Sequence, residues 1–485
     1  MKKSIIAAAA ASGVISSLIT YSLCGNSIID AKSVYNADVN GDGKVDVMDL
    51  NVIKNIVLDS APSIKTVPTV KPADEGSDKL TILCWNSNDS KPMVDFFCEK
   101  TGTDPSKINI KNFDVYGGAA AENYHAYLSD PSNDADLIFL ESDWCLDFIN
   151  DDAQTIPLSD LGYKESDFSD LYSYIVETGR STTTGALKGI SWQAAPGAFC
   201  YRTDLAEQYL AVKAPEEMQE KVKDWDTFID TARLLKLVNG PAISATLGGV
   251  SHAYRYSGDS SWIRNDHLVT TDYCTDFARM AYTLCNEGYV TKINQWTPEW
   301  LPLGQTDEVF GYFIPSWGFG DVILEYAAGG KAGSTFGLWN CTNGPSDFYW
   351  GGTWLAPAAR INNKELAKQF IDFFTINEES AEAYAKTQDE YISSNRKVMK
   401  NIISKGEYKG APVLGGQNQF EVLDRVAENI DVKGKITPYD YLLYSLFTSN
   451  VDSYCDGTFD TIDETIEAFK DDVAANITDG SVIVD

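Results

Sequence analysis

The sequence predicts an α/β fold, and three observations support this prediction. Strand-like apolar segments alternate with helical segments from residue 80 to residue 141. Amphipathic helical patterns recur later in the chain, at 224–235 and 362–374. The composition is that of a globular protein, with 44% hydrophobic and 22% charged residues, and 485 residues suffice for roughly three average domains. We therefore expect one large α/β unit built around a parallel sheet.

An export signal or membrane anchor is expected at residues 1–27. Lys2 and Lys3 precede about 20 weakly apolar residues, which is the pattern of a secretory signal and just long enough to span a bilayer. Cys24 is a candidate lipidation site, although Leu23 before it is larger than a lipoprotein signal prefers. These features predict an extracellular protein at the cell surface that contacts the membrane only through its N-terminus.

The stretch "DVNGDGKVDVMD", residues 38–49, has the spacing of a calcium-binding loop. Calcium prefers oxygen ligands, which such a loop supplies at its positions 1, 3, 5, 7, 9 and 12. Gly43 stands at the sharp turn, and Asp49 occupies the last position, where Glu is usual. Calcium is therefore the expected cofactor, with a metal-free acidic turn as the alternative. The expected ligands are the side chains of Asp38, Asn40, Asp42, Asp46 and Asp49 and the carbonyl group of Lys44.

One helical segment, "LNVIKNIVL", follows this loop. Residues 36–58 therefore resemble a single repeat of a dockerin, the calcium module that docks enzymes onto cohesins. Dockerins carry two such repeats and the sequence shows one, so a cohesin partner is left open. Residues 59–78 follow as a linker, in which Pro62, Pro68 and Pro72 favour a semi-rigid, extended chain.

The large unit opens with a βαβαβ pattern. Parallel strands with right-handed crossovers are expected from this alternation. The predicted strands are 80–85, 108–115 and 135–141, and the predicted helices are 92–102 and 121–130.

Aromatic and polar residues follow two of these strands. The first strand ends in Trp85 and Asn86, and Asp143 and Trp144 follow the third. Open α/β sheets bind ligands beyond the carboxyl ends of their strands, so this position favours binding over packing for both tryptophans. Packing of the same rings in the core is the alternative.

Charge and cysteine usage exclude several functions. A formal net charge of -31 argues against nucleic acid and anionic membrane surfaces as partners, because both repel an acidic body. The nine cysteines include no C-x-x-C pair, which is poor support for a zinc site or a disulfide framework. We expect the cysteines after Cys24 to be mostly buried thiols.

No catalytic motif is complete, so the sequence does not predict an enzyme. The stretch "GVSHA" (249–253) lacks the second glycine of a nucleophile elbow, and "GGKAGST" (329–335) lacks the Ser or Thr that follows the P-loop lysine. An HExxH motif is not present in the sequence.

The segment order from residue 79 to the C-terminus resembles extracellular solute-binding proteins of ABC importers, family 1, in their carbohydrate-binding, maltose-binding-protein-like branch. Among the stretches that carry this resemblance are "ADLIFLESDW", "GISWQAAPGAFCYRTDLA" and "DFYWGGTWLAPAARINNKELAKQFIDFF". The resemblance implies a two-lobed periplasmic-binding-protein-like fold of type II with a hinge and a cleft, over residues 79–485. The implied lobes are about 79–193 with 354–412, and about 194–353 with 413–485; the implied crossings lie near Trp192–Gly197 and Trp350–Trp354.

The strand-end argument and the resemblance together predict a sugar site made of aromatic platforms and hydroxyl-binding polar groups. Arg202 is a weaker candidate, Trp225, Trp339 and Trp354 are expected in the core, and Trp262, Trp296 and Trp300 are left open. The predicted ligand-binding residues are Trp85, Asn86, Asp143, Trp144, Trp192, Gln193, Trp317 and Trp350.

These observations favour an extracellular protein that captures an oligosaccharide between its lobes and delivers it to the permease subunits of an ABC importer. The dockerin-like loop favours an alternative, a surface protein that adheres to polysaccharide in a cellulosome-like assembly without transport. A glycoside hydrolase is a third and weaker alternative.

Overall fold

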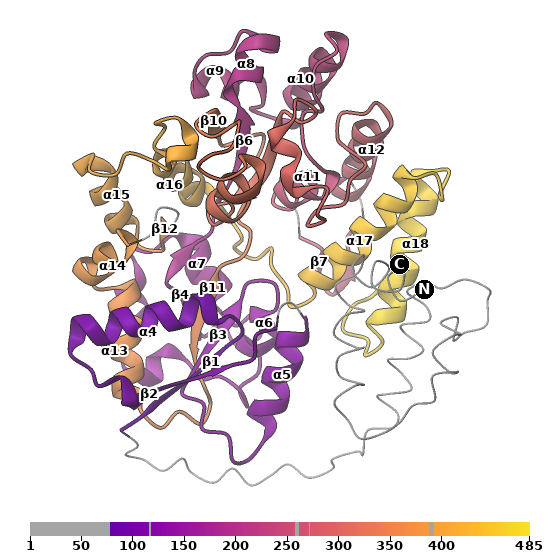
Figure 1. Cartoon of the computed structure of the whole chain (residues 1–485). Coiled ribbons are helices and arrows are strands. Elements are labelled where there is room, and N and C mark those ends of the chain that lie inside the picture. The colour runs from indigo at the N-terminus through magenta and orange to yellow at the C-terminus, as the bar shows by residue number, and fades with distance from the viewer. Residues whose placement is uncertain (1–77, 116–117, 258–260, 271, 388–391) are drawn as a thin grey trace, which may run out of the picture. The chain divides into compact units, whose positions relative to one another are not determined.

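The computed structural model describes residues 78–485 apart from 116–117, 258–260, 271 and 388–391 (Figure 1). The chain divides into two compact units, Met1–Lys71 and Pro72–Asp485, and every described residue belongs to the second. The predicted export segment, the calcium loop and the linker up to residue 77 therefore lie outside the described residues. Within the described part of the chain, no helix is both long and apolar enough to cross a membrane.

A five-stranded sheet of order β2-β1-β3-β11-β4 forms the first lobe. Its first three strands are β1 (Leu80–Cys84), β2 (Ile108–Asn112) and β3 (Leu137–Glu141), and β1 pairs parallel with both neighbours, as predicted. All of β1 is buried, as expected for a strand covered on both faces. The last two strands, β11 (Thr353–Pro357) and β4 (Ile190–Ser191), add to the sheet in antiparallel orientation from later in the chain, which the sequence did not predict.

Two pairs of helices pack beside this sheet (Figure 1). α4 (Ser87–Thr101) meets α13 (Lys364–Thr375) through Phe97 and Phe370, whose ring centroids lie 5.1 Å apart. α5 (Gly118–Ser129) meets α6 (Cys145–Ile149) through Tyr124 and Phe148, at 5.9 Å. The three predicted helices of this region are confirmed. α4 begins at Ser87 rather than at Pro92, so the proline lies inside the helix instead of opening it.

The second lobe is built on an antiparallel sheet of order β10-β6-β9. Its strands are β6 (Gly197–Arg202), β9 (Gly311–Pro315) and β10 (Trp339–Thr342). Alternate side chains of the central strand, β6, enter different cores: Cys200 belongs to the cluster that includes the first lobe, and Phe199 and Tyr201 belong to the second cluster. The sheet therefore separates two apolar layers.

Helices surround the sheet of the second lobe. The predicted helix at 224–235 is confirmed as α10 (Trp225–Leu237), and the side chain of Asp224 caps it by accepting from the backbone N–H of Thr227 at 2.8 Å. The other helical and short strand segments of this part are α8 (Thr203–Leu210), α9 (Pro215–Lys221), α11 (Leu247–Tyr254), β7 (Ile263–Arg264), β8 (His267–Leu268), α12 (Tyr273–Asn286), η5 (Leu301–Gln305) and the π-helix η6 (Phe319–Ala327).

Two adjacent segments carry the chain between the sheets. The first lies between β4 and β6 and includes β5 (Gln193–Ala194), and the second lies between β10 and β11. They pair with each other, because the backbone N–H of Trp350 donates to the carbonyl group of Ala195 at 3.0 Å. This agrees with the two predicted crossings; the exact lobe limits stay a prediction.

The C-terminal third completes both lobes. α17 (Asp440–Cys455) and α18 (Ile462–Asn476) pack with α12 in the second core. The elements before them are α14 (Glu378–Ala385), β12 (Ile392–Ser393), α15 (Arg396–Lys405), η7 (Pro412–Leu414) and α16 (Gln419–Asn429).

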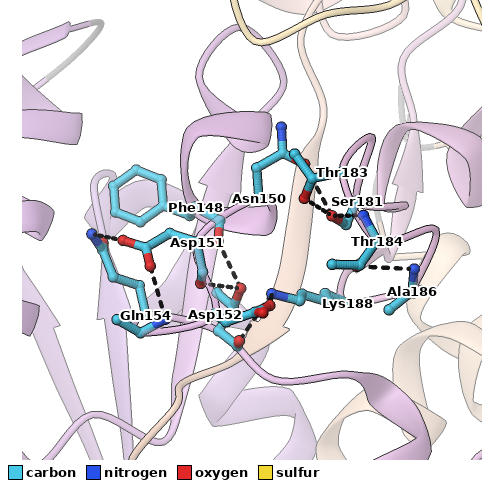
Figure 2. Close-up of polar contacts among 12 residues, drawn as sticks. Phe148, Asn150, Asp151, Asp152, Gln154, Ser181, Thr183, Thr184, Ala186 and Lys188 are labelled. Atoms are coloured by element: carbon cyan, nitrogen blue, oxygen red, sulfur yellow. Dashed lines mark hydrogen bonds and ion pairs between the residues drawn. The ribbon is translucent and has the colours of Figure 1, made fainter.

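The segment between α6 and β4 is fixed by a polar network (Figure 2). It contains η3 (Leu158–Leu161), η4 (Glu165–Phe168) and α7 (Ser173–Thr178). At its centre Lys188, whose side chain is 1% exposed, forms an ion pair with Asp152 at 2.6 Å and donates to the carbonyl group of Thr155 at 3.2 Å. A buried ammonium group needs such partners, so the pair fixes the segment that leads into the first crossing.

The tryptophans divide into core and surface rings. Trp339 and Trp354 are fully buried, and Trp225 packs against the second core, as predicted. Of the three that the sequence left open, Trp262 and Trp300 are core residues, whereas Trp296 is 51% exposed.

Candidate functional site

The candidate site begins at the carboxyl end of β3, where Glu141 ends the strand. The next residue, Ser142, donates its backbone N–H to the carbonyl group of Gly352 at 3.1 Å. Gly352 belongs to the second crossing, so the end of β3 lies directly beside the segment that joins the two lobes.

Glu141 has an unusual electrostatic environment. One oxygen of its carboxyl group accepts from the hydroxyl group of Ser142 at 2.8 Å, and the other accepts from the backbone N–H of Asp143 at 2.9 Å. Burial, with the neighbouring carboxylate of Asp143, raises the pKa of Glu141 to about 8. Its carboxyl group is therefore largely protonated at neutral pH and can donate a hydrogen bond.

An ion pair connects the lobes next to Glu141. Arg255 follows α11 of the second lobe and donates to Asp143 of the first lobe at 3.0 Å. The two side chains are only 9% and 22% exposed, so the pair is shielded from solvent. The guanidinium group also lies 5.0 Å from the ring centroid of Tyr444, at the start of α17.

Three tryptophans form a cluster on the second-lobe side, which we call the tryptophan cluster: Trp296, Trp317 and Trp350. The rings of Trp296 and Trp317 are stacked, with centroids 6.1 Å apart, and the indole N–H of Trp317 donates to the carbonyl group of Trp350 at 3.1 Å. His252 stacks on Trp350 at 3.7 Å. Burial, together with Arg255, lowers the pKa of His252 to about 3, so this ring is neutral.

Gly351 brings the tryptophan cluster and Glu141 together. A Cβ atom at this position would lie 3.1 Å from the indole nitrogen of Trp317 and 4.0 Å from a carboxyl oxygen of Glu141. Its φ of +80° is also one that L side chains rarely adopt. A glycine is therefore required where the aromatic and carboxyl halves of the site approach each other.

Tyrosines extend the site on both sides. Tyr349 stacks between Tyr256 and Tyr174, with ring centroids 4.7 Å and 4.9 Å away, and the hydroxyl group of Tyr174 accepts from the backbone N–H of Ala195 at 3.1 Å. Tyr441, on α17, is 41% exposed. Burial and then the charges of Asp143 and Glu141 raise the pKa of its hydroxyl group.

The structure brings three of the predicted site residues together, namely Asp143, Trp317 and Trp350. Trp85 and Asn86 lie at the end of β1 and are partly buried, and Trp85 packs against the first core. Gln193 is partly buried in β5, opposite Ser393 of β12.

Burial argues against two predicted platforms and one polar candidate. Trp144 is 5% exposed and packs edge-on against Tyr124, because α5 and α6 enclose it. Trp192 is 2% exposed. The buried guanidinium group of Arg202 is engaged by Asp204 and by two carbonyl groups, so it stabilises the second lobe instead of facing the site.

Sequence reasoning missed the partners that complete the site. Glu141 carried a signal, because it is the one charged residue of β3 and ends an otherwise buried strand. Arg255 carried none, since it is 112 residues from its partner in the sequence. His252, which stacks on Trp350, was not among the predicted site residues. In the described residues, no group of three or more His, Cys, Asp or Glu side chains could hold a metal ion.

Comparison with known proteins agrees with this two-lobed fold. A solved extracellular solute-binding protein of family 1 has a TM-score of 0.69 at 18% identity, over 82% of this chain and 99% of that chain. An ABC-transporter-associated binding protein of B. animalis subsp. lactis, solved with β-1,6-galactobiose, has a TM-score of 0.61 at 15% identity, over 84% and 99%. A galacto-N-biose/lacto-N-biose I-binding protein of Bifidobacterium longum, solved with lacto-N-biose, has a TM-score of 0.61 at 14% identity, over 85% and 100%.

No curated protein sequence matches the chain. A protein-family comparison does match, over residues 93–410, and the matched family is described as bacterial extracellular solute-binding protein. This range covers more than half of the chain and includes β3, Arg255 and the tryptophan cluster. The chain therefore belongs to the bacterial extracellular solute-binding proteins.

Proposed function

We propose that the protein binds a neutral oligosaccharide between its two lobes and delivers it to an ABC importer. The observation that supports this most strongly is the half-exposed Trp296 stacked on Trp317, because Gly351 separates the indole of Trp317 from the carboxyl group of Glu141. Sugar rings have apolar C–H faces that stack on indoles, while their hydroxyl groups need convergent donors and acceptors.

The polar groups of the site offer both acceptors and donors to the hydroxyl groups of a sugar. The carboxylate of Asp143 accepts from hydroxyl groups, whereas the protonated carboxyl group of Glu141 donates to a hydroxyl or ring oxygen. Tyr441 adds a half-exposed hydroxyl group from α17. The site thus offers donors and acceptors from both lobes.

The charges favour a neutral sugar. Arg255 is already paired with Asp143, and His252 is neutral. An acidic sugar would have to displace Asp143 from Arg255 and would meet further carboxyl groups, including that of Asp440. The solved galactobiose and lacto-N-biose complexes show that proteins of this fold hold disaccharides.

Closure of the two lobes around the sugar would connect sugar binding to delivery to the importer. The ion pair between Asp143 and Arg255 joins the lobes in the structure. A sugar that contacts both lobes stabilises this closed state over an open one, because ligand shifts the population toward the state it binds better. The closed form is then the form that the importer would receive. The site is a binding site, and no catalytic step is proposed for it.

The test is a titration of the full chain with malto-, cello-, xylo- and manno-oligosaccharides, followed by tryptophan fluorescence and calorimetry. One class of oligosaccharide should bind. Trp296→Ala should lower the affinity for that class about tenfold or more, which corresponds to about 1.4 kcal/mol of binding free energy. Tyr282→Ala is the matched control, since this ring is 42% exposed on α12 and stacks on Tyr454 instead. Absence of binding to every neutral sugar, or equal loss in both variants, would reject the proposal.

We further propose that the loop at 38–49 binds calcium and that residues 1–27 export the protein or anchor it at the surface, through Cys24 if lipidated. This loop is the observation that favours the second candidate function, adherence to polysaccharide with a cohesin as partner. Calorimetric titration of Ca²⁺ into the full chain and into Asp38→Ala tests the loop: one site should be lost in the variant. Pull-down on insoluble polysaccharide separates adherence from uptake of short chains.

A further inference from the structure

The cysteines of the described chain fall into two groups. Six of them are buried: Cys84, Cys98, Cys145, Cys200, Cys274 and Cys341. This agrees with the expectation of mostly buried thiols. The remaining two, Cys285 and Cys455, are partly exposed, and both lie at the edge of the second core.

These two cysteines are neighbours in space although they are far apart in the sequence. Cys285 lies in the last turn of α12, and Cys455 ends α17. The two helices pack together in the second core, and Tyr282 stacks on Tyr454 next to the cysteines, with ring centroids 4.7 Å apart. The interaction between the two thiols lowers the pKa of Cys285 and raises that of Cys455.

We propose that Cys285 and Cys455 form an intramolecular disulfide bond when the exported protein meets a thiol oxidant of the disulfide class. The proposal is independent of which solute the protein binds. It requires only that the chain leaves the reducing cytoplasm, as its family implies.

The reaction balances as two thiol–disulfide exchanges. The thiolate of Cys285 attacks one sulfur of the oxidant, forms a mixed disulfide and releases one thiolate. The thiolate of Cys455 then attacks the sulfur of Cys285 and releases the second thiolate. Two protein thiols are oxidised by two electrons in total, the oxidant disulfide is reduced to two thiols, and these take up the two protons.

The structure gives this order of attack a physical basis. Cys285 has the lowered pKa, so it is the thiolate that attacks first, while Cys455 stands in position to resolve the mixed disulfide. Partial exposure of both side chains lets a small oxidant reach them.

The bond would fix one end of the helix whose other end reaches the site. At the start of α17, the hydroxyl groups of Tyr444 and Ser251 are hydrogen-bonded at 2.6 Å, and Ser251 lies on α11, which leads to Arg255. The disulfide closes a long loop and so removes conformational freedom from the unfolded chain. We therefore expect it to stabilise the second lobe.

A second cysteine pair in the same lobe serves as an internal control. Cys200 and Cys341 face each other across β6 and β10, but both are fully buried. The amide group of Gln417 also holds the backbone N–H and carbonyl group of Cys341. A dissolved oxidant does not reach these thiols while the protein is folded, so they should stay reduced.

The experiment uses the full chain, reduced, freed of reductant and then treated with oxidised glutathione. Peptide mass spectrometry after alkylation should find a Cys285–Cys455 link, and the melting temperature should rise by several degrees over the reduced protein. Cys455→Ser should accumulate a glutathione adduct at Cys285 and lose the shift, while Cys98→Ser, in the first lobe, should keep both link and shift. The proposal would be overturned if both Cys285 and Cys455 were found alkylated. It would also be overturned if the only disulfide bonds found joined two protein molecules.

Discussion

At the scale of single residues, Glu141 shows how a site can hold a carboxyl group in its neutral form. Its carboxyl group is enclosed at a strand end beside Asp143, and both oxygens accept hydrogen bonds from the next two residues. Those bonds favour the charged form, but burial and the neighbouring carboxylate outweigh them and raise the pKa to about 8. The group therefore costs the folded state free energy wherever it must ionise.

This environment predicts a pH dependence of stability. Because the folded pKa of Glu141 lies above its ordinary value, the folded state retains a proton that the unfolded chain has lost between about pH 4.5 and about pH 8. The free energy of unfolding therefore falls as pH rises through this window, and the loss is complete above it. Glu141→Gln removes this contribution.

The measurement is urea unfolding of wild type and Glu141→Gln from pH 5 to pH 9. The difference in stability should grow in favour of the variant as pH rises. Burial also raises the pKa of Asp440 and Asp147, each to about 6, but both groups are present in both proteins and cancel in the difference. A difference that stays constant with pH would show that Glu141 titrates normally.

At the scale of elements, the second crossing depends on a glycine for two separable reasons. Gly351 has a φ of +80°, which costs an L residue about 1–2 kcal/mol, and its missing Cβ leaves room for the indole group of Trp317. A side chain at this position would therefore lower stability through its strained backbone. Its contact with Trp317 would in addition disturb the site.

Gly351→Ala should therefore lose about 1–2 kcal/mol of stability and also weaken sugar binding. Gly162→Ala is the matched control, because its φ is +87° and nothing lies within 4 Å of the added Cβ. It should lose similar stability and keep full affinity. Thermal melting and calorimetric titration of both variants check this, and equal affinities would show that Trp317 adjusts without consequence.

The polar network between α6 and β4 gives a second prediction for an element. Lys188→Ala removes a buried ammonium group with its methylene stem and should cost about 2 kcal/mol, since Asp152 is 75% exposed and is left solvated. Lys91→Ala breaks a comparable ion pair on α4 whose side chains are 69% and 61% exposed, and it should change stability by less than about 1 kcal/mol. Denaturant unfolding of the two variants compares them directly.

The features of the fold and site that could be predicted from the sequence are those set by residues close together in the chain. Features set by contacts between distant residues could not be predicted. The parallel strands β1, β2 and β3 and the helix α10 follow from local patterns and were predicted. The antiparallel addition of β11 depends on pairing across more than two hundred residues, and no local pattern contains it. The same limit explains Trp144: its position after a strand suggested a platform, but its burial is set by the packing of α5 and α6.

In the second unit as a whole, the ion pair between Asp143 and Arg255 connects the two lobes and should depend on whether they are open or closed. Asp143 and Arg255 come from opposite lobes and are both largely buried, so their separation on opening would rehydrate two charges. The ion pair contributes to closure only when both partners are present. The equilibrium between open and closed forms, and with it the affinity for sugar, should depend on Arg255.

Arg255→Gln should weaken sugar binding about tenfold, chiefly through faster dissociation, because a buried interfacial ion pair acts on the off-rate. Arg279→Gln is the control, since Arg279 pairs with Asp276 on the surface of α12 and is 65% exposed. Stopped-flow fluorescence gives both rate constants, and small-angle scattering with saturating sugar should show equal compaction in wild type and Arg279→Gln but less in Arg255→Gln. Unchanged dissociation in Arg255→Gln would mean that sugar contacts alone hold the lobes closed.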